Sequence, residues 1–472
     1  MTKKLKRRRR ATPQGLKPGS FHDALSARPK SRPDTKPPRN DGRPSPTQLV
    51  RIEKAIYGGA FLARAEGKAV FVPLVLPGEQ ARVRVVEEKR GYATAEVEEI
   101  VEVAAERVAP KCAHFGACGG CNYQHADYAA QLKFKKAILR ETLERGHVHA
   151  PEEMAVLAGE PWGYRNRIRV AFDAEGNVGY RGQRSHAVIA IAECPIAAPL
   201  LVRAALAGGE IARRQAPRLR LSETALFCDA EEKALLAQVA ASGGEKSRFE
   251  EFAQEWAETV PELKGVEFAS ATERGQSSLA VARWGASSLP YRAAGFEYRV
   301  DQGAFFQVNR LLVDGLAETV TGKARGAAGP RGGLAWDLFA GVGLFARRLA
   351  EQFEQVIAVE TATTAVAALD NNLAGTSATA VKATTIEFLR AGRNERPDLI
   401  VVDPPRTGLG AETTELLGRI GAPEVVYVSC DPATLARDLS ALIGMGYAIE
   451  EITLADLFPQ TFHLETVVKL RR

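Results

Sequence analysis

The sequence predicts a multidomain protein with a small N-terminal β-barrel, a central α+β domain and a C-terminal α/β domain. Its 472 residues are too many for one hydrophobic core and favour about three domains. Short alternating strand patterns fill residues 50–107. Strand and helix patterns alternate from about residue 315, which is typical of a parallel sheet covered by helices on both faces.

The first 46 residues read as a basic tail. Residues 1–50 carry 14 Lys or Arg and 3 Asp or Glu, a net charge of +11, so the rest of the chain carries −5 of the total of +6. Much proline and few apolar residues predict disorder in residues 1–46. Such an arm suits contact with nucleic acid, although a solubility tail or a cleavable targeting segment would have the same composition.

Composition also excludes several classes of protein. No run of about 18 apolar residues is present, and no apolar segment follows the basic N-terminus, so neither a membrane span nor a secretory signal is expected. The six cysteines are unevenly spaced, unlike those of a secreted disulfide scaffold. We therefore expect a cytoplasmic protein, and a monomer, because nothing indicates an obligate protein partner.

Residues 47–107 are expected to form the barrel. VRIEKAIYGGAF alternates and then breaks at Gly58-Gly59, and KAVFVPLV, ARVRVVEE and YATAEVEEI are further short strand candidates. Small barrels of this OB-like kind often bind oligonucleotides.

Residues 108–300 form the expected central domain, which contains a cysteine cluster. Cys112, Cys118 and Cys121 lie in KCAHFGACGGCNYQH, and Cys194 comes much later, before a proline. Four thiolates can hold zinc or an iron–sulphur cluster. A single C-x2-C pair is unusual for a zinc ribbon, so the spacing favours the iron–sulphur cluster. A helix is predicted over 127–145, and one arrangement open to it is packing on the C-terminal domain.

The C-terminal domain, residues 301–472, contains a glycine loop. In WDLFAGVGLFA a strand leads through Gly341 and Gly343 into a helix. Glu360 ends the next strand, where a carboxylate can accept the hydroxyls of a ribose. The pattern fits S-adenosylmethionine, the dinucleotide of a nicotinamide-dependent oxidoreductase, or a structural turn alone. Asp337 before the loop favours S-adenosylmethionine.

Two further motifs point to the same sheet edge. LIVVDPPRTG places Asp403 at the carboxyl end of a strand, where open parallel sheets bind ligands. In VVYVSCDPATLARDL, Cys430 lies between a strand and a helix, with Asp431 predicted as N-cap and Pro432 as first helical residue. We expect the helix N-terminus to lower the pKa of the Cys430 thiol and so favour the nucleophilic thiolate.

A methyl donor beside a thiolate indicates methylation of carbon 5 of uracil. Carbon 5 alone is too weak a nucleophile, but addition of a thiolate to carbon 6 activates it. A base must then remove the proton from carbon 5. The segment DLFPQTFHLETVVKL offers Glu465 as the favoured base and His463 as the weaker candidate.

With these motifs the chain resembles the S-adenosylmethionine-dependent RNA uracil-5-methyltransferases. The resemblance spans roughly residues 47–472, and GAFFQVN, DLFAGVG, DPPRTG, VSCDP and FPQTFHLE come in the family's order. It implies a Rossmann-like methyltransferase domain, with Cys430 as nucleophile and Glu465 as proton acceptor. The cofactor-binding residues that it implies are Gln307, Phe339, Glu360 and Asp403.

Two positions depart from the family's pattern. Leu344 stands where relatives often have Asn, and Thr384 stands where Asp or Asn is common. Whether these two residues contact the cofactor stays open.

The resemblance also covers the N-terminal half. The barrel resembles a TRAM domain, which binds RNA, and HFGACGGC with the distant Cys-Pro resembles the [4Fe–4S] site of an iron–sulphur branch of the family. RNA is therefore the expected partner, with 23S ribosomal RNA favoured and tRNA as the alternative. A nicotinamide-dependent oxidoreductase and a non-catalytic RNA-binding protein remain as more distant hypotheses.

Overall fold

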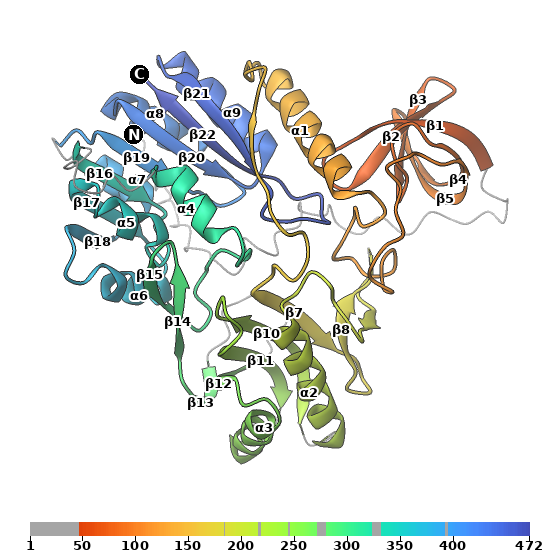
Figure 1. Cartoon of the computed structure of the whole chain (residues 1–472), viewed down its shortest axis with the longest axis horizontal. Coiled ribbons are helices and arrows are strands. Elements are labelled where there is room, and N and C mark those ends of the chain that lie inside the picture. Colours follow the sequence, from red (N-terminus) through yellow and green to blue (C-terminus); the bar gives the residue numbers. More distant parts are fainter. Residues whose placement is uncertain are drawn as a thin grey trace, which may run out of the picture.

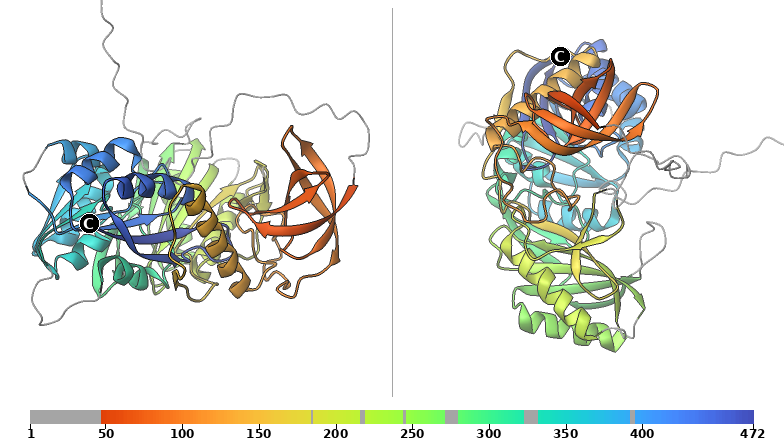
Figure 2. Two further views of the ribbon diagram at one scale, coloured as in Figure 1. Left: turned by 90° about the horizontal axis from the view of Figure 1, so that it is seen from above. Right: turned by 90° about the vertical axis from the view of Figure 1, so that its right-hand side faces the viewer.

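The computed structural model describes residues 47–183, 185–215, 219–243, 246–270, 280–322, 332–391 and 395–472. The predicted basic tail, residues 1–46, lies outside the described residues. Figure 1 shows a barrel, a central sheet and a C-terminal α/β domain, in that order along the chain. Seen from above, the barrel and the C-terminal domain lie at opposite ends of the molecule, and helix α1 runs between them (Figure 2).

The N-terminal part is a closed five-stranded barrel, as predicted. The strands follow one another around the barrel in the order β1 (Thr47–Ala55), β2 (Ala60–Ala65), β3 (Lys68–Pro73), β5 (Tyr92–Glu102) and β4 (Gln80–Glu88). Alternate residues such as Val50 and Ile52 fill its interior, as the two-residue period of a strand requires. The β1–β2 turn has Gly58 and Gly59 at φ +103° and +88°. A Cβ on Gly59 would lie 2.9 Å from the Asn122 side chain, so this turn packs closely on the cysteine loop.

Helix α1 (Tyr128–Arg145) joins the barrel to the C-terminal domain. The side chain of Asp127 accepts a hydrogen bond from the amide of Ala130 and caps the helix at the predicted start. Ala130 and Ile138 belong to the core of the barrel. Leu139 and Leu143, with residues of helix α9 (Pro432–Gly444), belong to the core of the C-terminal domain. The helix therefore contributes to two hydrophobic cores.

The central part is a seven-stranded sheet. Its order is β13 (Ala280–Gly285), β12 (Leu263–Ser270), β11 (Leu235–Gly243), β10 (Arg220–Cys228), β7 (Arg167–Phe172), β8 (Val178–Arg181) and β9 (Val188–Ala190). Helices α2 (Pro199–Gln215) and α3 (Lys246–Thr259) pack on it and on each other. Trp256 is fully buried there, and its indole donates to the carbonyl of Ala204 at 2.9 Å. A separate hairpin, β14 (Ser288–Ala293) and β15 (Phe296–Asp301), leads to the C-terminal domain.

The C-terminal domain is built on an eight-stranded sheet. Its order is β18 (Ala378–Lys382), β17 (Phe353–Glu360), β16 (Gly332–Leu338), β19 (Leu399–Val402), β20 (Glu424–Ser429), β22 (Glu465–Arg471), β21 (Ala448–Ala455) and β6 (Ala155–Leu157). The strands from β18 to β20 pair in parallel, as predicted, whereas β22 is antiparallel to both of its neighbours. Strand β6 precedes the central sheet in sequence, yet it pairs in parallel with β21.

Helices cover both faces of this sheet. One core contains residues of α4 (Val313–Thr321), α5 (Leu344–Leu349) and α6 (Thr363–Leu373). The opposite core contains residues of α1, α7 (Thr385–Arg390), α8 (Gly410–Ile420) and α9. Nowhere in the described part of the chain is a helix both long and apolar enough to cross a membrane.

Candidate active site

The glycine loop lies between β16 and α5, at the carboxyl end of the sheet. Gly341 and Gly343 have φ of +56° and +93°, and Phe339 is strained at φ +71°. The amide of Gly341 donates to Oε2 of Glu360 at 2.9 Å, and the amide of Phe339 donates to the carbonyl of Val359 at 3.1 Å. The loop is thus tied to the end of β17. No atom lies within 4 Å of the position that a Cβ on Gly341 would take, so the loop is open on that side.

Three carboxyl groups gather around this loop. Asp337 is fully buried; its Oδ2 accepts the amide of Ala346 at 2.8 Å, while its Oδ1 has no partner among the described residues. Burial raises the pKa of Asp337 to about 8, and the charges of Asp403 and Glu360 add to the rise. Burial likewise raises the pKa of Asp403 to about 7. A cationic ligand at this place would favour the ionised form of both carboxyls.

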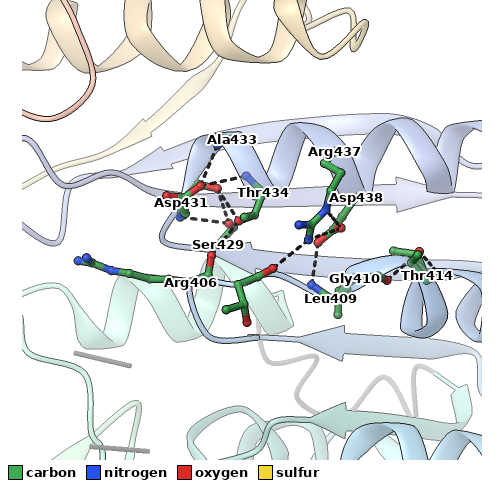
Figure 3. Close-up of polar contacts among 12 residues, drawn as sticks. Arg406, Leu409, Gly410, Thr414, Ser429, Asp431, Ala433, Thr434, Arg437 and Asp438 are labelled. Atoms are coloured by element: carbon green, nitrogen blue, oxygen red, sulfur yellow. Dashed lines mark hydrogen bonds and ion pairs between the residues drawn. The ribbon is translucent and has the colours of Figure 1, made fainter. Parts of the chain in front are cut away.

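Cys430 lies where β20 ends and α9 begins. Asp431 is the N-cap of α9, and its Oδ1 accepts the amides of Ala433 and Thr434 at 3.0 and 2.9 Å (Figure 3). Pro432 is the first helical residue. The local structure therefore confirms the predicted strand, cap and helix around the cysteine.

The predicted direction of the thiol pKa was wrong. Burial raises the pKa of the Cys430 thiol, and the charges of Glu465 and Asp403 raise it further, while Arg406 opposes them. The helix end does not compensate, because the carboxylate of Asp431 already occupies it and adds another negative charge. In the free protein the thiol is therefore protonated and needs a proton acceptor before it can act as a nucleophile.

The two candidate bases differ sharply in their surroundings. Glu465 is the first residue of β22 and is buried, and burial and the charge of Asp403 raise the pKa of its carboxyl. Nη2 of Arg406 lies 3.2 Å from Nδ1 of His463. Burial and the charge of Arg406 lower the pKa of His463 to about 3. The imidazole is neutral and accepts from Arg406, which leaves Glu465 as the better proton acceptor.

Two residues near Cys430 were missed by the sequence predictions. Tyr57, in the β1–β2 turn of the barrel, contacts the ring of Phe462 edge-on, with centroids 5.5 Å apart. Burial and the charges of Asp431 and Cys430 raise the pKa of the Tyr57 phenol, which places it near the cysteine. No local sequence pattern predicts this contact, because it joins the β1–β2 turn to residues about 400 positions later. Arg406 stands inside the motif DPPRTG, so its place in that motif was the available signal.

Gln307 and the two residues that depart from the family's pattern have defined surroundings. Gln307 is buried, and its backbone carbonyl accepts from Nδ2 of Asn166 at 2.8 Å. Leu344, the first residue of α5, packs in the hydrophobic core beneath the loop. Thr384 caps α7 in a reciprocal capping box with Glu387. The two departures from the family's pattern thus have structural roles, one in packing and one in capping.

The four predicted ligand cysteines lie together in a hollow that His463 also lines. Cys112, Cys118, Cys121 and Cys194 line one hollow of about 300 Å³. The amide of Gly120 donates to Sγ of Cys118 at 3.4 Å, and the hydroxyl of Tyr180 donates to Sγ of Cys194 at 3.5 Å. Across the described ranges, no three or more His, Cys, Asp or Glu side chains are arranged to hold a metal ion. The predicted iron–sulphur site therefore stays a prediction.

Comparison with known proteins covers the barrel and the catalytic domain. Residues 46–98 match the TRAM domain, and residues 283–472 match the family described as tRNA (Uracil-5-)-methyltransferase. The solved structure of the Pyrococcus abyssi tRNA (uracil-54, C5)-methyltransferase in complex with S-adenosyl-L-homocysteine superposes with a TM-score of 0.71. At 23% identity, covering 90% of this chain and 100% of that chain, this likeness shows the shared fold.

Curated relatives match at higher identity. The chain is 33% identical over 444 residues to an uncharacterized RNA methyltransferase of Streptomyces avermitilis, covering 89% of this chain and 97% of the relative. It is 32% identical over 437 residues to the 23S rRNA (uracil(1939)-C(5))-methyltransferase RlmD of Pseudomonas entomophila, covering 89% and 92%. Identity at this level over nearly the whole length of both chains, on a shared fold, shows that the chain belongs to the family of S-adenosylmethionine-dependent RNA uracil-5-methyltransferases.

Proposed function

We propose that this protein methylates carbon 5 of a uridine in 23S ribosomal RNA, with Cys430 as nucleophile and Glu465 as base. The observation that carries the proposal is the meeting of a thiol and a buried carboxyl at the sheet edge that bears the glycine loop. Ser429 pairs with Thr466 across β20 and β22, which brings the adjoining residues Cys430 and Glu465 side by side. The RlmD relatives support ribosomal RNA as the substrate. A tRNA substrate is the alternative, supported by the family description and by the Pyrococcus abyssi enzyme.

The residues around the glycine loop fit S-adenosylmethionine. The loop is open at Gly341, and Oδ1 of Asp337 is buried without a partner beside it. Glu360 and Asp403 supply carboxylates suited to ribose hydroxyls and to a cationic ligand, and Phe339 and Gln307 are the further proposed contacts. When bound, the cofactor supplies an electrophilic methyl group on a positively charged sulfur.

The mechanism begins with the loss of the Cys430 proton. Asp403 in its ionised form is the nearby acceptor, because its charge acts on the thiol. Glu465 stays unprotonated for the later step. The sulfur of Cys430 then forms a bond to carbon 6 of uracil, and the electron pair of the 5,6 double bond moves toward carbon 5 and the adjacent carbonyl. Carbon 5 gains the methyl group and still carries its proton.

Glu465 completes the reaction. Its carboxylate accepts the proton from carbon 5, the carbon–sulfur bond breaks, and the 5,6 double bond re-forms as the thiolate leaves. A raised pKa suits this role, because it makes the carboxylate a stronger base than an exposed one. His463 takes no part as a base, since its Nδ1 accepts from Arg406.

For the cysteine hollow we propose a [4Fe–4S] cluster held by the four thiols. Each cysteine binds a different iron of such a cluster, so its ligands stand further apart than those of a single ion. The observation behind this proposal is that all four cysteines line one hollow. The cluster would tie Cys194 to the 112–121 loop. Iron and acid-labile sulfide content of anaerobically purified protein tests the proposal, and four-fold Cys→Ser protein is the control.

The function is tested with RNA that contains 5-fluorouridine. Fluorine on carbon 5 cannot leave as a proton, so the methylated adduct stays attached to Cys430. Protein and S-adenosylmethionine are mixed with substituted 23S rRNA fragments or tRNA, and covalent complexes are resolved on a denaturing gel. A shifted band with ribosomal RNA that is absent in Cys430→Ala is expected. A band with tRNA alone would identify tRNA as the substrate, and no band with any RNA would contradict the proposal.

A further inference from the structure

The loop that leads to Glu465 is held by bonds from distant parts of the chain. Residues 456–464, called the strap here, connect β21 to β22, and Glu465 follows directly. Four consecutive carbonyl oxygens of the strap accept hydrogen bonds from other segments. The carbonyl of Leu457 accepts from Asn309 at 3.2 Å, that of Phe458 from Lys135 at 2.9 Å, that of Pro459 from Tyr164 at 3.0 Å, and that of Gln460 from the amides of Asn122 and Tyr123 at 2.9 and 3.0 Å.

Helix α1 makes the strongest of these attachments. Nζ of Lys135 lies 2.6 Å from Oδ1 of Asp456, and both side chains are fully buried. One turn earlier, the side chain of Gln131 accepts the amide of Gln460 at 2.9 Å and donates to its Oε1 at 3.0 Å. The backbone of Gln460 has φ +67°, a conformation that a residue with a side chain seldom adopts. The α1 bonds hold this strained residue in place.

Stability alone does not account for such an ion pair. Taking two charges out of water offsets most of their attraction, so a buried pair contributes little net stability compared with apolar residues of the same size. It does fix geometry, because either charge left alone in the core would be costly. Asp456 is the first residue of the strap and lies nine residues before Glu465, so the ion pair fixes the position of the strap.

We infer that Lys135 and Gln131 are positioning residues that hold the strap so that the Glu465 carboxyl stays beside Cys430. The inference rests on the proposed function. Cys430 sits on a different connection, between β20 and α9, and receives none of these strap bonds. Removing the α1 anchor should therefore slow proton removal from carbon 5 and leave addition of the thiol and methyl transfer in place. Proton transfer is sensitive to displacements of about 1 Å, which makes this step the vulnerable one.

The test uses a variant that removes both buried charges together. Lys135→Met with Asp456→Leu replaces the pair by apolar residues and leaves no unpaired charge. Lys133→Met is the matched control, because Lys133 is an exposed residue of the same helix. Two readouts are taken for each protein: adduct formation on 5-fluorouridine RNA, and steady-state methylation of ordinary RNA with a denaturing gel for covalent complexes.

For the double variant we expect adduct formation on 5-fluorouridine RNA at the wild-type rate. With ordinary RNA we expect kcat to fall at least about tenfold with unchanged KM, and a covalent methylated complex to accumulate. Lys133→Met should match the wild type. If the double variant does not fold, Gln131→Met is used and should give the same pattern.

Two outcomes would overturn the inference. Equal loss of adduct formation and turnover in a folded variant would mean that α1 supports the whole site rather than the base. Unchanged turnover would mean that the anchor does not position Glu465. Absence of adduct in the wild-type protein itself is a separate result, because it contradicts the proposed function rather than the role of α1.

Discussion

Nη2 of Arg406 lies 3.2 Å from Nδ1 of His463, so the imidazole accepts a hydrogen bond beside a fixed positive charge. Burial, together with the charge of Arg406, lowers the pKa of His463 to about 3 and keeps the ring neutral near neutral pH. Within two residues of the same segment, the pKa of Glu465 moves in the opposite direction. The two candidate bases are thereby separated by their environments.

Substituting each candidate base in turn tests which of the two removes the proton from carbon 5. Glu465→Gln should lower kcat by about 10²- to 10⁴-fold, the range for loss of a general base, and should let the methylated adduct accumulate on ordinary RNA. His463→Gln should lower kcat by less than about tenfold, because the amide oxygen of Gln can still accept from Arg406. Rapid-quench kinetics with gel separation of adducts gives both values. A larger defect in His463→Gln would move the base role to the histidine.

Cys430 should be slow to react with alkylating agents in the free protein. Burial and the neighbouring carboxylates raise the pKa of its thiol, so little thiolate is present near neutral pH. The alkylation rate should rise steadily from pH 7 to 9 without reaching a plateau. Peptide mapping after timed iodoacetamide treatment measures modification at this cysteine, with Cys430→Ala as the control. Fast alkylation at pH 7 would show that the helix N-terminus lowers the thiol pKa more than burial and the carboxylates raise it.

Binding of S-adenosylmethionine should strengthen as the pH rises from 6 to 8. Asp403 and Asp337 have pKa values of about 7 and 8, so both are largely protonated at pH 6. A cationic sulfonium favours the ionised carboxyls, and the ionised fraction of Asp403 grows about tenfold over this interval. The dissociation constant should fall by about the same factor, with protons released on binding.

Calorimetry in buffers of different ionisation enthalpy measures that proton release. S-adenosylhomocysteine is the matched control, because its sulfur carries no charge. Its affinity should change much less between pH 6 and 8. Equal pH dependence for the two ligands would argue that the carboxyls respond to another part of the cofactor.

Thr384 offers a test of stability that is separate from catalysis. Its hydroxyl accepts a hydrogen bond from the amide of Glu387, and the Glu387 carboxylate accepts one from the amide of Thr384. Thr384→Ala should lower the free energy of unfolding by about 1 kcal/mol, the usual value of an N-cap. Thr384→Asp should retain it, because Asp is an equally good cap. Urea denaturation measures the difference in the free energy of unfolding. An unchanged value in Thr384→Ala would show that α7 does not depend on the capping box.

Local patterns were enough to predict the parts of the fold that local physics decides. The barrel strands alternate in hydrophobicity, Asp127 and Asp431 are capping residues at helix starts, and the loop glycines at 341 and 343 have positive φ. Each of these follows from a few neighbouring residues.

Long-range features could not be read in the same way. Strand β6 has three residues, too few to show a period, and its partner β21 lies about 300 positions later. The approach of Tyr57 to the cysteine and the attachments of the strap also join distant segments. The sign of the Cys430 pKa shift depends on burial and on carboxylates from other motifs, neither of which the local pattern VSCDP reveals.

The pairing of β6 with β21 has a consequence for how the chain is made. Both β6 and α1 leave the ribosome before the central sheet, while β21 and α9, their partners in the C-terminal domain, emerge near the end of synthesis. Leu139 and Leu143 of α1 therefore lack their α9 packing partners until almost the whole protein has been translated. A fragment that starts at the central sheet would lack an edge strand and a covering helix. The C-terminal domain is thus completed by two elements from the first third of the chain. The candidate active site can therefore assemble only once synthesis of the chain is nearly finished.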